Sequence, residues 1–107
     1  MSMSQERKKL GENMNFKQVI ELFVSGEKEG CSAGQGNLKI KGDSLIHYFT
    51  PILERYGDKY ILNFSRYSIV TGRLQKQIKE MIPEDKIIQI TKVPEGYKGS
   101  LADFIGD

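Results

Sequence analysis

The chain has 107 residues, of which 38% are hydrophobic and 28% charged, and its formal net charge is +2 at pH 7. This length predicts one domain with one hydrophobic core. The small positive charge does not by itself indicate nucleic acid or a membrane surface as the partner.

The low counts of cysteine and histidine and the short apolar runs exclude several classes of protein. Cys31 and His47 are the only residues of their kinds, which excludes an intrachain disulfide and a Cys/His zinc site within one chain. No apolar run approaches the roughly 20 residues of a membrane-spanning helix. The polar N-terminal stretch lacks the apolar core of a secretory signal. We therefore expect a cytoplasmic protein that is not associated with membranes.

The first predicted element is a short amphipathic helix. Residues 1–13 are polar and charged and predict a flexible lead-in, so that residues 14–107 form a single α+β domain. Asn15 and Gln18 have the spacing of a capping box, and Gly26 is a natural C-terminal stop. The apolar positions that share one face of this helix are Phe16, Val19, Ile20 and Phe23.

Residues 26–37 are rich in glycine and small polar residues and predict a linker. The segment lacks the Gly-Lys-Ser/Thr ending of a phosphate-binding loop and leads into a strand instead of a helix. Cys31 lies in this loop, but a nucleophilic thiol needs a nearby base. No pattern places His47 beside it, so a catalytic Cys–His pair is disfavoured.

The central part of the chain predicts β-structure. Its strands are expected at residues 38–41, 45–49, 52–56 and 59–64. Gly42-Asp43 and Gly57-Asp58 predict tight turns between them. Thr50-Pro51 predicts a bulge, a bend or a sheet edge, because proline cannot donate a hydrogen bond to a neighbouring strand.

The last third of the chain predicts a helix, a strand and a short terminal helix. The first of these helices is capped by Ser68 or Thr71 and ends before Pro83, and Ser100 can cap the terminal one. A strand is expected at residues 86–93. The predicted fold is α+β: a small antiparallel sheet of about four strands with helices mainly on one face, in the order helix, strands, helix, strand, short helix.

Candidate catalytic groups are few. His47 is predicted to be a sheet-face residue whose ring is satisfied by a hydrogen bond, because the sequence aligns none of its candidate partners, Glu54, Asp58 and Ser65, with it. No spacing resembles a set of metal ligands. The hydroxyl groups around Ser68 could hold an anion at a helix N-terminus, although self-capping explains them as well. The sequence therefore predicts no catalytic residue, metal or cofactor.

Residues 36–82 are more basic than the whole chain, with eight Lys or Arg residues against four Asp or Glu residues. Tyrosines are interleaved with these cations, and such a surface can stack the bases of a single strand. A single-stranded nucleic-acid site on this surface would use Lys39, Lys41, Arg55, Tyr56, Lys59, Tyr60, Arg66 and Arg73.

The same stretch resembles a family of small phage- and prophage-encoded domains of unknown function. The segments that carry the likeness are residues 36–38, 45–48, 50–52, 60–63, 66–68 and 71–75. The resemblance implies a non-enzymatic binding module of phage or mobile-element origin, acting as an inhibitor of a host-defence protein in the manner of anti-CRISPR proteins. The charge of +2 argues against the acidic DNA mimicry that many such inhibitors use.

In that interpretation the partner is a host protein or a protein–nucleic acid complex. The predicted partner-binding residues are Arg66, Tyr67, Arg73, Lys76 and Lys79. A free strand edge could also pair two copies into a homodimer. Single-stranded nucleic-acid binding is the alternative function.

Overall fold

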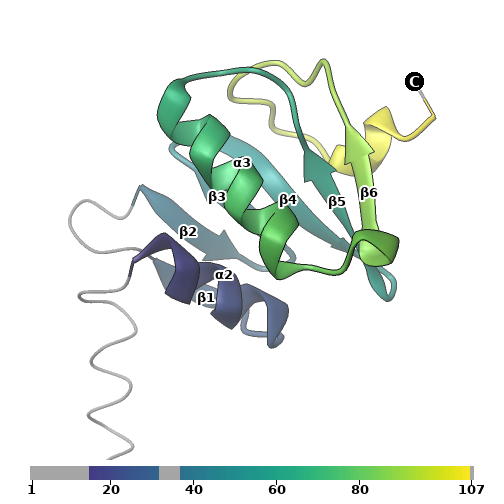
Figure 1. Ribbon diagram of the computed structural model, residues 1–107. Helices are drawn as coiled ribbons and strands as arrows, with labels where there is room; N and C mark the ends of the chain where they lie inside the picture. The colour runs from purple at the N-terminus through teal and green to yellow at the C-terminus, as the bar shows by residue number, and fades with distance from the viewer. Residues whose placement is uncertain (1–14, 32–36, 107) are drawn as a thin grey trace, which may run out of the picture.

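The computed structural model describes residues 15–31 and 37–106 (Figure 1). The predicted lead-in at residues 1–13 lies outside these residues. The helices are α2 (Phe16–Val24) and α3 (Ile69–Met81), with short 3-10 turns η1 (Glu84–Lys86) and η2 (Leu101–Phe104). The strands are β1 (Glu29–Cys31), β2 (Leu38–Lys41), β3 (Ser44–His47), β4 (Thr50–Tyr56), β5 (Lys59–Asn63) and β6 (Ile87–Ile90). The predicted α+β class is confirmed. Within the described part of the chain, no helix is long and apolar enough to cross a bilayer.

All six strands form one sheet in the order β1-β2-β3-β4-β5-β6. Neighbouring strands are antiparallel from β1 to β5, but β6 pairs parallel to β5 after the chain has crossed through α3. The prediction of about four antiparallel strands is therefore correct in direction from β1 to β5, but it is wrong in the number of strands and for β6, which pairs parallel. The added strand β1 comes from the segment predicted to be a linker, where Gly30 pairs with Ile40.

Both α-helices begin at the side-chain caps expected from the sequence. In α2 the Asn15 side chain accepts from the backbone N–H of Gln18, and the Gln18 side chain accepts from the backbone N–H of Asn15, each at 2.9 Å. This is the predicted capping box. In α3, Ser68 is the N-cap and accepts from the backbone N–H of Thr71 at 3.2 Å.

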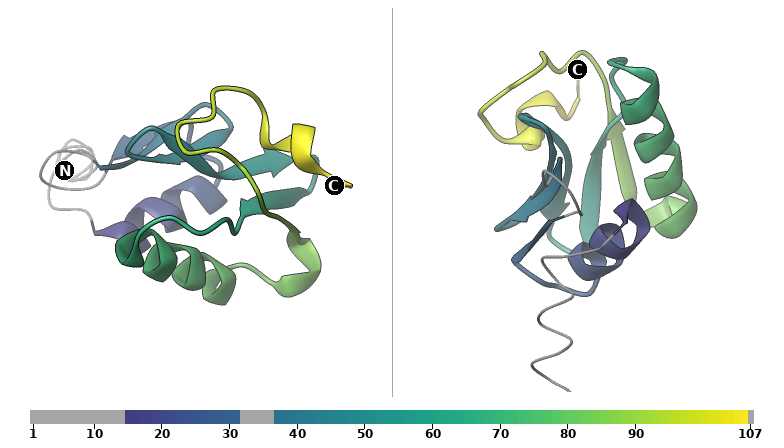
Figure 2. Two further views of the ribbon diagram at one scale, coloured as in Figure 1. Left: turned by 90° about the horizontal axis from the view of Figure 1, so that it is seen from above. Right: turned by 90° about the vertical axis from the view of Figure 1, so that its left-hand side faces the viewer.

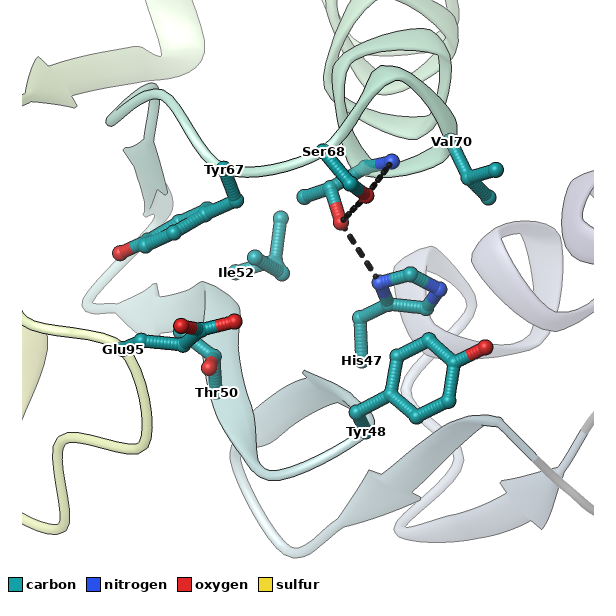
Figure 3. A pocket seen from close by; sticks show the side chains of 9 residues that line it. His47, Tyr48, Thr50, Ile52, Tyr67, Ser68, Val70 and Glu95 are labelled. Carbon is teal, nitrogen blue, oxygen red and sulfur yellow. Dashed lines mark hydrogen bonds between the residues drawn. The ribbon is translucent and has the colours of Figure 1, made fainter.

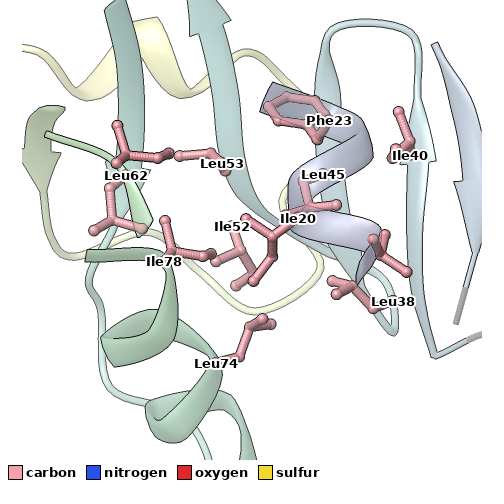
Figure 4. Packing of buried hydrophobic residues seen from close by; sticks show 12 residues of the cluster. Ile20, Phe23, Leu38, Ile40, Leu45, Ile52, Leu53, Leu62, Leu74 and Ile78 are labelled. Carbon is pink, nitrogen blue, oxygen red and sulfur yellow. The ribbon is translucent and has the colours of Figure 1, made fainter. Parts of the chain in front are cut away.

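The sheet has a hydrophobic core on each face. Figure 2 shows α2 and α3 on one side of the sheet and the segment after β6 on the other. The helices α2 and α3 cover one face, and their buried side chains pack against those of the sheet in the larger core shown in Figure 4. The segment after β6 passes to the opposite face. There η2 closes a smaller core made by Ile61, Ile90, Val93 and Leu101. The predicted terminal helix is this four-residue 3-10 turn.

The β3–β4 connection differs from the prediction. The chain turns at Tyr48-Phe49, which was expected to be strand, and Tyr48 has a left-handed φ of 59°. The bulge expected at Thr50-Pro51 is present: strand β4 includes Pro51, and its pairing with β3 is irregular there, since Leu45 pairs with Leu53 and Ile46 with Pro51. One extra β4 residue at this bulge breaks the alternation of faces.

Candidate functional site

The open face of β2, β3 and β4 carries two short rows of side chains. Lys39, Ile46 and Pro51 are opposite one another across the three strands, and Lys41, Ser44 and Glu54 form the next row. Residues opposite one another in an antiparallel sheet share a face. Leu38 and Ile40 are buried under the helices. Lys39 and Lys41 alternate with them along β2 and therefore point to the opposite face of the sheet.

The segment after β6 supplies the other wall of a groove over these rows. The groove has a volume of about 380 Å³. The side chains and backbone that line it are those of Lys39, Lys41, Ser44, Ile46, Tyr48, Phe49, Pro51, Tyr97, Lys98 and Gly99. The three lysines are exposed, and Phe49 at the turn is 77% exposed. The groove therefore combines three cations with a large aromatic surface in contact with water.

Hydrogen bonds within the molecule hold the acidic groups near this groove. The Glu54 carboxylate accepts from the Ser100 hydroxyl at 2.6 Å and from the Leu101 backbone N–H at 2.8 Å. The Tyr97 hydroxyl donates to the Asp103 carboxylate at 2.6 Å, and this bond raises the pKa of Tyr97 above its usual value. The bonds of Glu54 fasten the wall that carries Lys98 to the sheet, and the Tyr97–Asp103 bond joins two parts of that wall to each other.

A second hollow lies on the helix-covered side of the β3–β4 turn (Figure 3). Its volume is about 400 Å³. It is lined by His47, Tyr48, Thr50, Ile52, Tyr67, Ser68, Val70, Thr71 and Glu95. Tyr48 borders both hollows, so they meet at this side chain. We call the first hollow the groove and the second the pocket.

His47 in the pocket is only 3% exposed, and burial lowers its pKa below 6.5. Its Nδ1 is 3.0 Å from the Thr71 hydroxyl, which in turn is 3.1 Å from the Ser68 hydroxyl. The ring is therefore hydrogen-bonded to Thr71 and to none of the partners considered from the sequence, Glu54, Asp58 and Ser65. Nε2 has no hydrogen-bond partner among the described residues. In the described part of the chain no carboxylate is hydrogen-bonded to the imidazole, and its one bonded side chain is the neutral Thr71.

Arg55, predicted to contact nucleic acid, binds backbone carbonyl groups instead. Its guanidinium donates to the carbonyls of Phe23 and Glu27, both at 2.6 Å, and to that of Gly42 at 2.7 Å. It also lies 4.0 Å from the centre of the Phe23 ring. Arg55 therefore joins α2 and the β2–β3 turn to the sheet through both terminal nitrogens of its guanidinium.

Two of the predicted tyrosines are also engaged inside the fold. The Tyr60 hydroxyl donates to the Val24 carbonyl at 3.3 Å, and its ring packs against Phe23. The Tyr67 hydroxyl donates to the Val93 carbonyl at 2.6 Å and accepts from the Asn63 amide at 3.0 Å. Their hydroxyl groups therefore hold neighbouring segments together, and Tyr67 keeps only its ring for a ligand in the pocket.

The other predicted residues are exposed but lie in separate places. Tyr56 and Lys59 flank the β4–β5 turn, at the end of β4 away from the groove. Arg66 precedes α3, and Arg73, Lys76 and Lys79 lie on α3 itself, where the Lys79 ammonium is 5.1 Å from the centre of the Phe64 ring. Of the predicted nucleic-acid residues only Lys39 and Lys41 line the groove. Sequence reasoning did not name Phe49, Tyr97 and Lys98.

Comparison of the chain with known protein families, with curated proteins and with solved structures found no match. In the described ranges 15–31 and 37–106, no group of three or more His, Cys, Asp or Glu side chains could hold a metal ion.

Proposed function

We propose that this chain is a non-enzymatic binding module that holds single-stranded nucleic acid in the groove. The observation that supports this proposal is the exposed Phe49 ring beside three exposed lysines in one concave surface. A single strand presents phosphates at regular intervals and bases whose faces are free to stack. Lysine ammonium groups attract the phosphates, and an exposed aromatic ring stacks a base.

The groove places positive charge on two sides of a bound strand. The cations Lys39 and Lys41 come from one strand, and Lys98 comes from the opposite wall, so a ligand between them meets positive charge on both sides. The aromatic surface lies at the β3–β4 turn beside them. A strand that follows the groove therefore places its backbone along the lysines and a base on Phe49.

Fluorescence anisotropy with labelled single-stranded DNA of about 10 nucleotides, a length within the usual site size, tests this function. We expect binding that weakens steeply as salt is raised. Phe49→Ala should weaken binding about tenfold, as the loss of one base stack does. Lys39→Ala should weaken binding and reduce the salt dependence.

Matched control variants lie at the other end of the same sheet and on α3. Tyr56→Ala removes an exposed aromatic ring, and Lys76→Ala removes an exposed lysine, without touching the groove. Both should bind like the original protein. Absence of binding at low salt, or equal losses in the control and groove variants, would contradict the proposal.

Binding of a host protein through α3 is a second candidate function. The observation that favours it is the exposure of two apolar side chains, Ile69 at 79% and Val70 at 51%, at the start of the helix that carries Arg73, Lys76 and Lys79. Exposed apolar residues beside cations are common at protein interfaces. In this candidate the chain is an inhibitor of phage or mobile-element origin that acts on a host-defence protein in the host cytoplasm.

A pull-down from host lysate with the original protein and an Ile69→Ser/Val70→Ser variant tests the second candidate. We expect a stoichiometric partner that the variant fails to retain. Recovery of no such partner, or equal recovery with the variant, would count against it. Sedimentation of the purified protein tests the homodimer that we propose through an edge strand, β1 or β6.

A further inference from the structure

The pocket adjoins the groove at Tyr48, and its chemistry differs from that of the groove. We propose that the pocket receives one base of the bound strand and prefers bases with an exocyclic amino group, an inference that rests on the proposed nucleic-acid function. The groove supplies lysines, whereas the charged residue of the pocket is Glu95. A carboxylate repels a phosphate and accepts hydrogen bonds from an amino group. The pocket is therefore suited to a base and unsuited to the strand's backbone.

Glu95 is held in place by the bonds of its own loop. The backbone N–H of Gly96 donates to the Thr50 hydroxyl at 2.8 Å, which ties the loop to the start of β4. Two residues before Glu95, Val93 donates to the Ser65 hydroxyl at 2.9 Å and accepts from the Tyr67 hydroxyl at 2.6 Å. The loop is thus fastened on both sides of Glu95. Among the described residues, the Glu95 carboxylate itself has no hydrogen-bond partner or ion pair, so it is free to accept from a ligand.

Hydroxyl groups lie on the wall across from Glu95. Figure 3 shows Ser68 at the start of α3 and Glu95 beside Thr50 on the opposite side of the pocket. The Ser68 hydroxyl is joined to that of Thr71, and the Thr71 hydroxyl is joined to the buried His47 ring. This chain of hydrogen bonds fixes the position of both hydroxyl groups. A base between the two walls can donate to Glu95 from one edge and meet Ser68 with another.

Apolar surfaces complete the pocket. Ile52 and Val70 line it, and the Tyr67 ring forms a further wall. The Tyr67 hydroxyl bonds described above hold that ring in one orientation, so it offers a fixed aromatic surface. The volume of about 400 Å³ is large enough for one base. An aromatic face combined with polar groups at the edges is how unstacked bases are usually recognised.

Binding of oligodeoxycytidine and oligodeoxyuridine of equal length, measured near neutral pH, tests this inference. The two bases have the same size. At position 4 cytosine carries an amino group and uracil an oxygen, and at the neighbouring N3 cytosine accepts a hydrogen bond whereas uracil donates one. We expect the cytidine strand to bind about tenfold more tightly, since one such contact discriminates by roughly 1–3 kcal/mol. Glu95→Gln should reduce the preference several-fold, because the amide is a weaker acceptor and can also donate to uracil.

Glu84→Gln is the matched control, because Glu84 is an exposed glutamate on η1 and lines neither hollow. It should keep the preference for cytidine. Equal, salt-dependent binding of both strands would overturn the pocket inference and leave the proposed function intact. A preference for cytidine that is unchanged in Glu95→Gln would have the same consequence. Failure of both strands to bind would overturn the proposed function and the pocket inference with it.

Discussion

At the scale of single residues, His47 shows what burial does to a titratable group. The ring lies between Phe16 and Tyr48, with centroid separations of 5.5 and 4.6 Å, and its only hydrogen-bond partner among the described residues is the Thr71 hydroxyl. Among the residues that the structure describes, no anionic group is bonded to the ring to stabilise an imidazolium charge. Desolvation therefore lowers the pKa of His47 in the folded protein below 6.5.

This shift predicts that the protein loses stability on mild acidification. Above pH 6.5 His47 is mostly neutral in the folded and the unfolded chain. As the pH falls below 6.5, the unfolded chain binds a proton that the folded chain does not, so the free energy of unfolding decreases, by at most about 1.4 kcal/mol per pH unit. The decrease ends below the folded-state pKa. Urea denaturation over this pH range measures it.

His47→Gln is the control for that prediction. The variant should be less stable overall, but its free energy of unfolding should not depend on pH in this window. Asp43 does not interfere, because the Lys28 ammonium holds the pKa of its carboxyl below 3.8. A pH dependence of equal size in the variant would show that another group is responsible.

At the scale of elements, two glycines predict opposite effects of one substitution. Gly57 in the β4–β5 turn has a left-handed φ of 64°, and Gly72 lies inside α3. An added methyl group meets no atom within 4 Å at either position, so the effect of the substitution on stability depends only on the backbone conformation. Gly57→Ala should destabilise the protein by about 1 kcal/mol or more, and Gly72→Ala should stabilise it by about 1 kcal/mol. Thermal unfolding of the two variants checks both signs, and a shift in the same direction would contradict the assignment.

The elements that could be predicted from the sequence are those with a local signal. Asn15 and Gln18 predicted the start of α2, and the turns at Gly42-Asp43 and Gly57-Asp58 are present. The turn at Tyr48-Phe49 could not be predicted, because two aromatic residues favour a strand and neither favours a left-handed turn. Strand β1 was missed because its three residues are held by pairing with β2, and their composition is that of a loop.

The candidate site was less predictable than the fold, for a physical reason. The predicted cations and tyrosines were named because they are interleaved in one basic stretch of the sequence, and this pattern does not say which face of the sheet each side chain takes. The bulge at Pro51 also shifts the faces within β4. Arg55 and Tyr60 are opposite one another on β4 and β5 and face the helices, where they bind carbonyl groups. Lys98 and Glu95 reach the sheet only because the segment after β6 passes around its end. No local pattern in the sequence reports such a crossing.

At the scale of the whole molecule, the C-terminal segment is a third layer on the sheet. Leu101 in η2 is fully buried in the smaller core, whereas Ile105 just beyond it is partly exposed. Leu101→Ala should therefore lower the free energy of unfolding by about 2–5 kcal/mol, and Ile105→Ala by much less. Chemical denaturation of both variants measures the difference. Similar losses in the two would show that this layer does not contribute a packed core.

The order of strands in the sheet also bears on how the chain folds. From β1 to β5 each strand pairs with the next one along the chain, so these contacts join residues that are close in sequence. Short separations cost little chain entropy to close, and proteins with such contacts fold faster than sheets of the same size with distant pairings. Strand β6 differs, because α3 separates it in the sequence from its partner β5. Its pairing therefore requires that the chain first crosses through α3. Docking of β6, followed by the segment that carries Glu95 and Lys98, is therefore expected to be the late step of folding, so the groove and the pocket would be completed last.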